Sequence, residues 1–90
     1  MTSDEWREHL IEDPSNELVH FSFAKALMDE KKWIEAAHEF EILTQNNLDY
    51  AIAWAFLARC HLRAGNREAA RVACEKGLPA ARKLNHEIPI

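Results

Sequence analysis

The sequence predicts an all-α protein with about five helices in a single domain. Helix-favouring residues (Ala, Glu, Leu, Lys and Arg) are abundant, whereas β-branched residues are sparse. Apolar residues recur at helical spacing, as Ala36, Phe40 and Leu43 do. Ninety residues fit one small domain and are too few for two ordinary ones. The expected fold is therefore a small helical domain.

Capping and stop signals set the expected helix boundaries. Thr2 followed three residues later by Glu5 is a capping box. Pro14 ends the first helix because the residue before a proline avoids the α region. Gly65 is the usual C-terminal stop and ends the fourth helix. The helices are expected over roughly residues 3–12, 17–30, 33–45 and 50–64, with a fifth that begins near Asn66 or Arg67.

Two positions leave the local structure open. Either Ser15 or Asn16 can cap the second helix, since both side chains carry an acceptor oxygen. Pro79 lies inside the pattern of the fifth helix, where its ring clashes with the carbonyl of Glu75 and its nitrogen carries no hydrogen. We expect a kink or a break at Pro79.

The charge of the chain disfavours two classes of partner. Eleven basic against 15 acidic residues give a net charge of −4, whereas nucleic acids and anionic membranes attract basic surfaces. The acidic N-terminus lacks the apolar stretch that a secretory signal has. No segment is long and apolar enough for a membrane span. Two cysteines do not make a disulfide framework. We expect a cytoplasmic protein without a nucleic-acid or membrane partner.

An internal repeat predicts how the helices are arranged. When the sequence is shifted along itself by 34 residues, Phe23-Ala24 matches Leu57-Ala58 and Ala36 matches Ala70. Further matched pairs are Leu27 with His61, Phe40 with Cys74, Trp6 with Phe40, and Pro14 with Leu48. Each period contains a helix–turn–helix unit, so the chain reads as one half unit followed by two full units.

This pattern resembles the tetratricopeptide (TPR) repeat, which has the same period and the signature Trp-x2-Leu-Gly-x2-Tyr, then Ala-x3-Phe, then Pro. The second unit reads Trp54-x2-Leu57-Ala58-x2-His61, followed by Ala70-x3-Cys74. The chain departs from the signature: His20 stands at the Trp position of the first unit, Ala replaces both Gly residues, and Leu48 and Arg82 replace the proline.

The resemblance implies antiparallel helix–turn–helix repeats stacked as a short right-handed solenoid in one TPR domain over residues 1–90. Residues 1–14 would be a half repeat, 15–48 repeat one, 49–84 repeat two and 85–90 a tail.

Several residues suggest chemistry at first sight. Cys60 and His61 are adjacent, and Glu35 and Glu39 are one helical turn apart. Adjacent helical residues point about 100° apart and cannot easily share a metal ion. We expect Cys60 to pack in the core, His61 to be a partly buried ring with one hydrogen bond, and the two glutamates to be solvated. Cys74, at the Phe position of repeat two, is also expected in the core. The sequence thus predicts no catalytic residue, metal site or cofactor, and an enzyme or metal protein built on these residues remains an alternative.

The resemblance implies a concave groove lined by the first helix of each repeat. Lys25, Arg59 and Arg63 would form a basic line among apolar neighbours, which suits a peptide with acidic residues between hydrophobic anchors. Alternatively, the two arginines merely solvate an exposed face and pair with Asp29 or with glutamates. The expected groove residues are Leu18, Phe21, Lys25, Met28, Asp29, Ile52, Ala55, Phe56, Arg59, Leu62 and Arg63.

The expected function is a non-catalytic protein–protein interaction module, a small bacterial cytoplasmic adaptor that binds a peptide or partner helix in this groove. The alternative is a small TPR-like chaperone that shields a subunit of a secretion system or another assembly. A carboxylate clamp of the co-chaperone type is not expected, because Phe21 and Phe56 occupy matching places and a third repeat is absent.

The C-terminal edge of the stack is expected to be open. Leu78, Leu84, Ile88 and Ile90 lie near it, and no capping helix is evident. Repeat arrays bury apolar surface only against neighbouring units. We expect a second copy of the chain or a partner to cover this edge, or else a longer native chain.

Overall fold

The computed structural model describes residues 1–87, which form helices and connecting turns without a β-strand. The all-helical fold class and the number of helices expected from the sequence are confirmed. Helix boundaries agree with the expected ones within one or two residues. The helices are α1 (Ser3–Glu12), α2 (Glu17–Asp29), α3 (Trp33–Asn46), α4 (Ala51–Arg63) and α5 (Arg67–Glu87).

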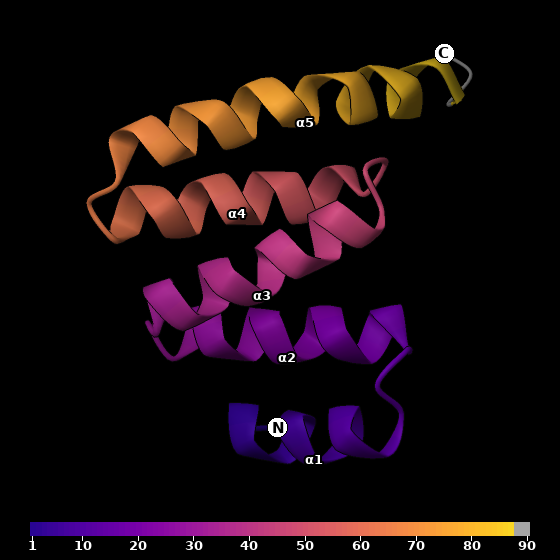
Figure 1. Cartoon of the computed structure of the whole chain (residues 1–90), viewed down its shortest axis with the longest axis vertical. Helices are drawn as coiled ribbons and strands as arrows, with labels where there is room; N and C mark the ends of the chain where they lie inside the picture. The colour runs from indigo at the N-terminus through magenta and orange to yellow at the C-terminus, as the bar shows by residue number, and fades with distance from the viewer. Residues whose placement is uncertain (88–90) are drawn as a thin grey trace.

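The helices are stacked in sequence order, with the N-terminus at one end and the described C-terminus at the other (Figure 1). The main interhelical contacts join sequence neighbours, α1 with α2, α2 with α3, α3 with α4, and α4 with α5. The principal extents are 38 × 31 × 21 Å and the radius of gyration is 13.3 Å, against about 12 Å for a compact domain of this length. The stack is therefore slightly elongated.

Side chains cap the first two helices as the sequence predicts. Thr2 and Glu5 form a complete capping box, in which the Thr2 side chain accepts from the Glu5 N–H and the Glu5 carboxylate accepts from the Thr2 N–H. Asn16, and not Ser15, caps α2, since its Oδ1 accepts from the Val19 N–H at 3.2 Å. Each such cap contributes about 1 kcal/mol to helix stability.

The period found in the sequence recurs in the backbone. α2 and α4 begin at Glu17 and Ala51, and α3 and α5 begin at Trp33 and Arg67, so both pairs start one period apart. The turns that join the paired helices also match. Lys31 and Gly65, which are again one period apart, are the residues of the described chain with positive φ, at 61° and 85°.

The same hydrogen bonds close both turns. After α2, the Lys32 N–H donates to the Leu27 carbonyl at 2.9 Å, and after α4 the Asn66 N–H donates to the His61 carbonyl at 2.8 Å. A bond from the residue after the left-handed position back across the last turn is the mark of a Schellman motif. Gly65 adopts this conformation without strain, whereas Lys31 has a Cβ that disfavours it.

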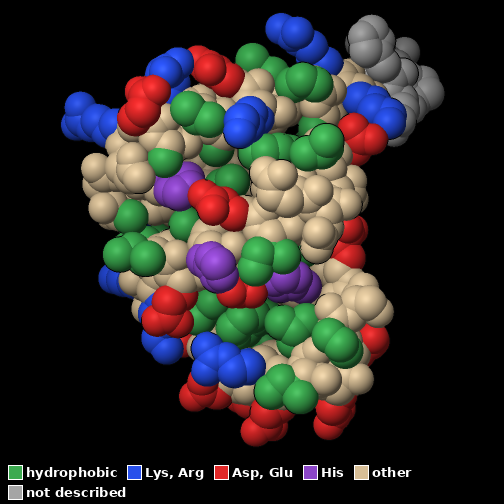
Figure 2. Space-filling view, in the orientation of Figure 1, with side chains coloured by type: hydrophobic (Ala, Val, Ile, Leu, Met, Phe, Trp, Pro, Cys, Tyr) green, Lys and Arg blue, Asp and Glu red, His purple; other side chains and the backbone are tan. Residues whose placement is uncertain are grey.

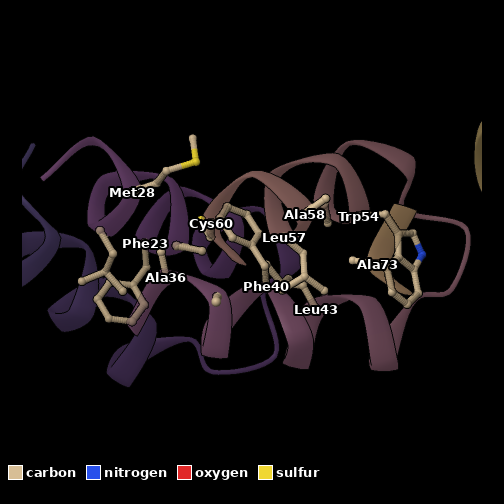
Figure 3. Close-up of a cluster of buried hydrophobic side chains, with 14 of the residues drawn as sticks. Phe23, Met28, Ala36, Phe40, Leu43, Trp54, Leu57, Ala58, Cys60 and Ala73 are labelled. Atoms are coloured by element: carbon tan, nitrogen blue, oxygen red, sulfur yellow. The ribbon is translucent and has the colours of Figure 1, made fainter. Parts of the chain in front are cut away.

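The core lies between successive helices (Figure 3). Ala24, Ala36 and Ala53 have no exposed surface, so backbones approach closely at these positions. Phe40, at 0% exposure, is the largest of the fully buried side chains. Burial of a side chain of this size contributes about 1.5–3 kcal/mol.

Close approach also holds α5 against α4. A Cβ added at Gly77 would lie 2.7 Å from the Trp54 Cβ and 3.1 Å from its Cγ, so the site has room only for glycine. Trp54 is itself fixed, since its indole N–H donates to the Leu48 carbonyl at 3.0 Å.

Of the kink or break expected at Pro79, the break does not occur, because α5 continues as one helix from Arg67 to Glu87 (Figure 1). Pro79 removes the hydrogen bond to the Glu75 carbonyl. Both residues are exposed, however, so water can satisfy that carbonyl. The cost of the proline is therefore low enough for the helix to continue.

The expected burial of Cys74 is also wrong, because its side chain is exposed. Phe40, its equivalent in the preceding repeat, is buried because α4 packs on α3. Within residues 1–87, no helix packs in the same way on α5. Leu78 and Leu84 are each 48% exposed beside this edge, and the expected Ile88 and Ile90 lie outside the described residues.

Replacement of Gly77 should test the contact between α4 and α5. Gly77→Ala adds a methyl group within 2.7 Å of Trp54, and we expect a loss of about 1–3 kcal/mol in the free energy of unfolding. Urea unfolding followed by circular dichroism measures the change. Pro79→Ala is the control in the same helix and should be neutral or stabilising. A Gly77→Ala protein as stable as the wild type would contradict the close approach.

Replacement of Lys31 should relieve backbone strain. Lys31→Gly should stabilise the protein by about 0.5–1 kcal/mol, since glycine adopts positive φ without the Cβ penalty but loses more entropy on folding. Lys32→Gly, one residue later and without positive φ, should destabilise. The same urea titration compares them, and equal effects would argue against strain at Lys31.

Candidate functional site

An aromatic cluster joins α2, α3 and α4. Phe40 of α3 lies beneath Phe21 of α2 and Phe56 of α4, with ring centroids 5.8 and 5.7 Å away. Phe21 and Phe56 are stacked on each other at 5.8 Å, and Tyr50 stacks on Phe21 at 5.5 Å. The cluster extends from the core to the protein surface, because three of its rings are half-buried: Phe21, Phe56 and Tyr50. Burial raises the pKa of Tyr50, with a smaller contribution from the charge of Glu17.

Two cations from different helices converge on the Phe56 ring. The Lys25 Nζ on α2 lies 6.0 Å from the ring centroid, and the Arg59 Cζ on α4 lies 5.8 Å from it. A cation over an exposed ring gains about 0.5–1 kcal/mol. Lys25 also forms an ion pair with Asp29, with Nζ and Oδ1 2.7 Å apart. We call Phe21, Lys25, Phe56 and Arg59 the aromatic–basic patch.

Arg63 lies apart from this patch. Its Cζ is 5.8 Å from the ring centroid of Trp33, one helical turn beyond Arg59. Among the residues that the structure describes, neither Arg59 nor Arg63 has a carboxylate within salt-bridge distance. The structure therefore pairs Asp29 with Lys25 and not with an arginine. Within the described residues, the expected pairing of Arg59 and Arg63 with Asp29 or glutamates does not occur, and both lie on aromatic rings.

A cavity adjoins the patch between α1 and α2. It has a volume of about 430 Å³ and is lined by the patch residues Phe21 and Lys25 together with Trp6, Asp29 and Glu30. Its far end is acidic, since Glu30 and Asp29 lie beside the N-terminal turn of α1. The surface is thus basic over α4 and acidic toward α1.

Glu30 fixes the start of α1. The Ser3 N–H donates to its Oε2 at 2.7 Å and the Ser3 hydroxyl donates to its Oε1 at 2.8 Å. These bonds hold the pKa of Glu30 below its usual value, and the bond from the Ser3 backbone N–H has the largest effect. Ser3 is 1% exposed, so α1 is anchored by a buried hydroxyl rather than by apolar contacts alone.

The other expected groove residues divide into three groups. Leu18, Ile52 and Leu62 are 70%, 48% and 57% exposed and are free to contact a partner. Ala55 lines a different surface, an apolar groove between α4 and α5. Met28 is 6% exposed and belongs to the core, so its assignment to the groove is wrong. α2 packs against both α1 and α3, which covers a wider arc of the helix than one neighbour would.

Cys60 and His61 are packing residues, as the sequence predicts. Cys60 has no exposed surface, and burial raises the pKa of its thiol to about 11. A thiol that remains protonated near neutral pH is a poor nucleophile. The His61 side chain is 14% exposed, and its Nε2 lies 3.1 Å from the Glu41 Oε1, which is the one polar partner expected for this ring.

Sequence reasoning missed a second histidine–glutamate pair. The His20 Nε2 lies 2.8 Å from the Glu39 Oε1, and their side chains are only 12% and 19% exposed. Glu39 was expected to be solvated, whereas Glu35 is exposed as expected. Histidine and acidic side chains lie close together on the face of the stack in Figure 2. The signal was available, because a histidine at the Trp position of a packing stripe requires a polar partner on the next helix.

No group of three or more His, Cys, Asp or Glu side chains that could hold a metal ion occurs in the described part of the chain. Within residues 1–87 there is also no helix long and apolar enough to cross a membrane. No family model, curated protein or solved structure matches the chain.

The bond between Ser3 and Glu30 predicts a pH dependence of stability. Because the pKa of Glu30 is lowered from 4.5 on folding, its contribution is complete above that value and is lost as the pH falls through the folded pKa. Thermal melts should show Glu30→Gln less stable than the wild type near pH 7, with a smaller difference near pH 3. Glu35→Gln, which removes an exposed carboxylate, is the control. A constant difference at both pH values would contradict the assignment.

Proposed function

We propose that this chain is a non-catalytic protein-interaction module of the TPR type, which binds an acidic peptide or the acidic face of a partner helix. The proposal is carried by the convergence of Lys25 and Arg59 on the Phe56 ring. Support for the TPR arrangement comes from the regular spacing of helices and left-handed turns, and from contacts that join sequence neighbours.

The patch has the chemistry of a binding hot spot. Rings that are already packed lose little conformational freedom when a ligand binds, which favours affinity. Phe56 is held by Phe21 and Phe40, and Arg59 is held over Phe56. Arginine and aromatic residues are enriched among residues that dominate binding energy. A carboxylate placed beside Arg59 would gain an ion pair that no described carboxylate supplies.

The surroundings indicate what accompanies the acidic group. Leu18, Ile52 and Leu62 are exposed apolar side chains on the same two helices as the patch. A ligand with leucine-like anchors on either side of its acidic residues would contact both kinds of surface. The same apolar residues would serve a chaperone that shields an amphipathic helix, and such a ligand would depend less on charge.

A cytoplasmic location is part of the proposal. Its support is that Cys60 and Cys74 are both free, since free thiols suit the reducing cytoplasm.

Peptide display gives a test that needs no known ligand. Selection against the purified protein should enrich peptides in which Asp or Glu alternates with large apolar residues. Arg59→Glu should weaken the selected peptides about tenfold or more, about 1.4 kcal/mol, and added salt should weaken them further. Asp29→Asn should strengthen them, because Lys25 then has no competing carboxylate.

Arg82→Glu is the matched control, since it makes the same change of charge as Arg59→Glu at an exposed position on α5. It should alter affinity less than twofold, as expected for a charge remote from the patch. Equal losses for Arg59→Glu and Arg82→Glu would refute the patch as the site. Selection of apolar peptides that tolerate both changes would favour the chaperone.

A further inference from the structure

The edge formed by α4 and α5 is an apolar groove without a charged lining. It has a volume of about 240 Å³, and its lining includes Ala51 and Ala55 of α4 and Cys74, Leu78 and Ala81 of α5. By contrast, the linings of the cavities beside α1, between α3 and α5, and at the turns before α2 and α3 all include charged side chains. An acidic peptide would find no partner in this groove. Its chemistry fits an apolar helix face.

The chain itself shows that this face is built for helix packing. The residues one repeat before Cys74 and Leu78 are Phe40 and Thr44, and both are 0% exposed where α4 covers α3. Cys74 is exposed and Leu78 is 48% exposed at the equivalent places on α5. The exposed face of α5 is therefore equivalent to the face of α3 that α4 covers. The α4–α5 groove lacks such a covering helix.

α5 is also longer than its equivalent in the preceding repeat. α3 ends at Asn46, which corresponds to Ala80, whereas α5 continues to Glu87. The additional turns extend past the start of α4 (Figure 1). Leu84, which is 48% exposed, lies in this extension of α5.

We propose that the covering helix is α5 of a second copy of this chain, packed antiparallel across a twofold axis. Leu78, Ala81 and Leu84 recur at three-residue spacing along the described part of α5, and Cys74 lies one turn before Leu78. A twofold contact buries this stripe in both copies at once and closes the assembly. Because the groove has no charged lining, a contact within it buries no charged side chain of the groove. The small side chains at positions 74 and 81 allow the two helices to approach closely.

The dimer would leave the proposed peptide site accessible. No residue of the aromatic–basic patch lines the α4–α5 groove. Each dimer would then present two patches, and linked sites raise the apparent affinity for a partner with repeated acidic segments. The dimer does not depend on that proposed function, and the two fail in different experiments.

Sedimentation of the full chain over a wide concentration range tests the proposal. The wild type should shift from monomer to dimer as the concentration rises, and the association should be weak because a contact over few helical turns is a small interface. Leu78→Glu should remain monomeric throughout, a loss of at least about tenfold in association. Ile34→Glu, which replaces an apolar residue that is 78% exposed on α3, should dimerise as the wild type does.

Two further measurements keep the result decisive. Circular dichroism checks that Leu78→Glu is folded, and Leu84→Glu replaces it if it is not. Cys74 is exposed while Cys60 is buried, so maleimide labelling of the native protein reports on Cys74. Labelling should slow as the protein concentration rises. A monomer at every concentration, a Leu78→Glu dimer, or labelling independent of concentration would overturn the proposal.

Discussion

The structure depends on the contact of Phe40 with Phe21 and Phe56. Three helices meet at these rings, and Phe40 has no exposed surface. α2 and α4 each pack on α3, and at this cluster the rings of α2 and α4 also touch each other directly. A stack in which helices touch mainly their sequence neighbours has few other interactions that reach across a helix. The cluster therefore helps to fix the position of α2 relative to α4.

The same rings form the floor of the proposed binding surface. The Phe56 ring packs on Phe40 in the core, and the cations of Lys25 and Arg59 also lie over it. A substitution of Phe56 would therefore change stability and binding together. The cations contribute little to the core, so recognition can be altered through them alone. This separation of roles between ring and cation makes charge reversal a cleaner probe of the surface than truncation of the ring.

Local signals predict much of this fold. The capping box at Thr2, the glycine stop at Gly65 and the burial of Cys60 depend on the residue and its near neighbours, and the structure confirms all three. Met28 and Cys74 were assigned wrongly because burial of a helical residue depends on how many helices surround it, which periodicity does not report. The break at Pro79 does not occur for a related reason, since the cost of the proline depends on whether water reaches the Glu75 carbonyl. The position of His20 indicates that it needs a polar partner, but the identity of that partner, Glu39, required knowledge of the facing helix.

The turns at Lys31 and Gly65 have a consequence for how such repeats diverge. Both adopt the same left-handed conformation with equivalent hydrogen bonds, although one residue is a lysine and the other a glycine. The backbone of the turn is therefore the same in both units, although only one unit has a glycine there. Copies of a repeat can drift until few identities remain, provided that the spacing of the turns is kept. In this chain the two units are therefore more similar in the spacing of their turns than in their residues.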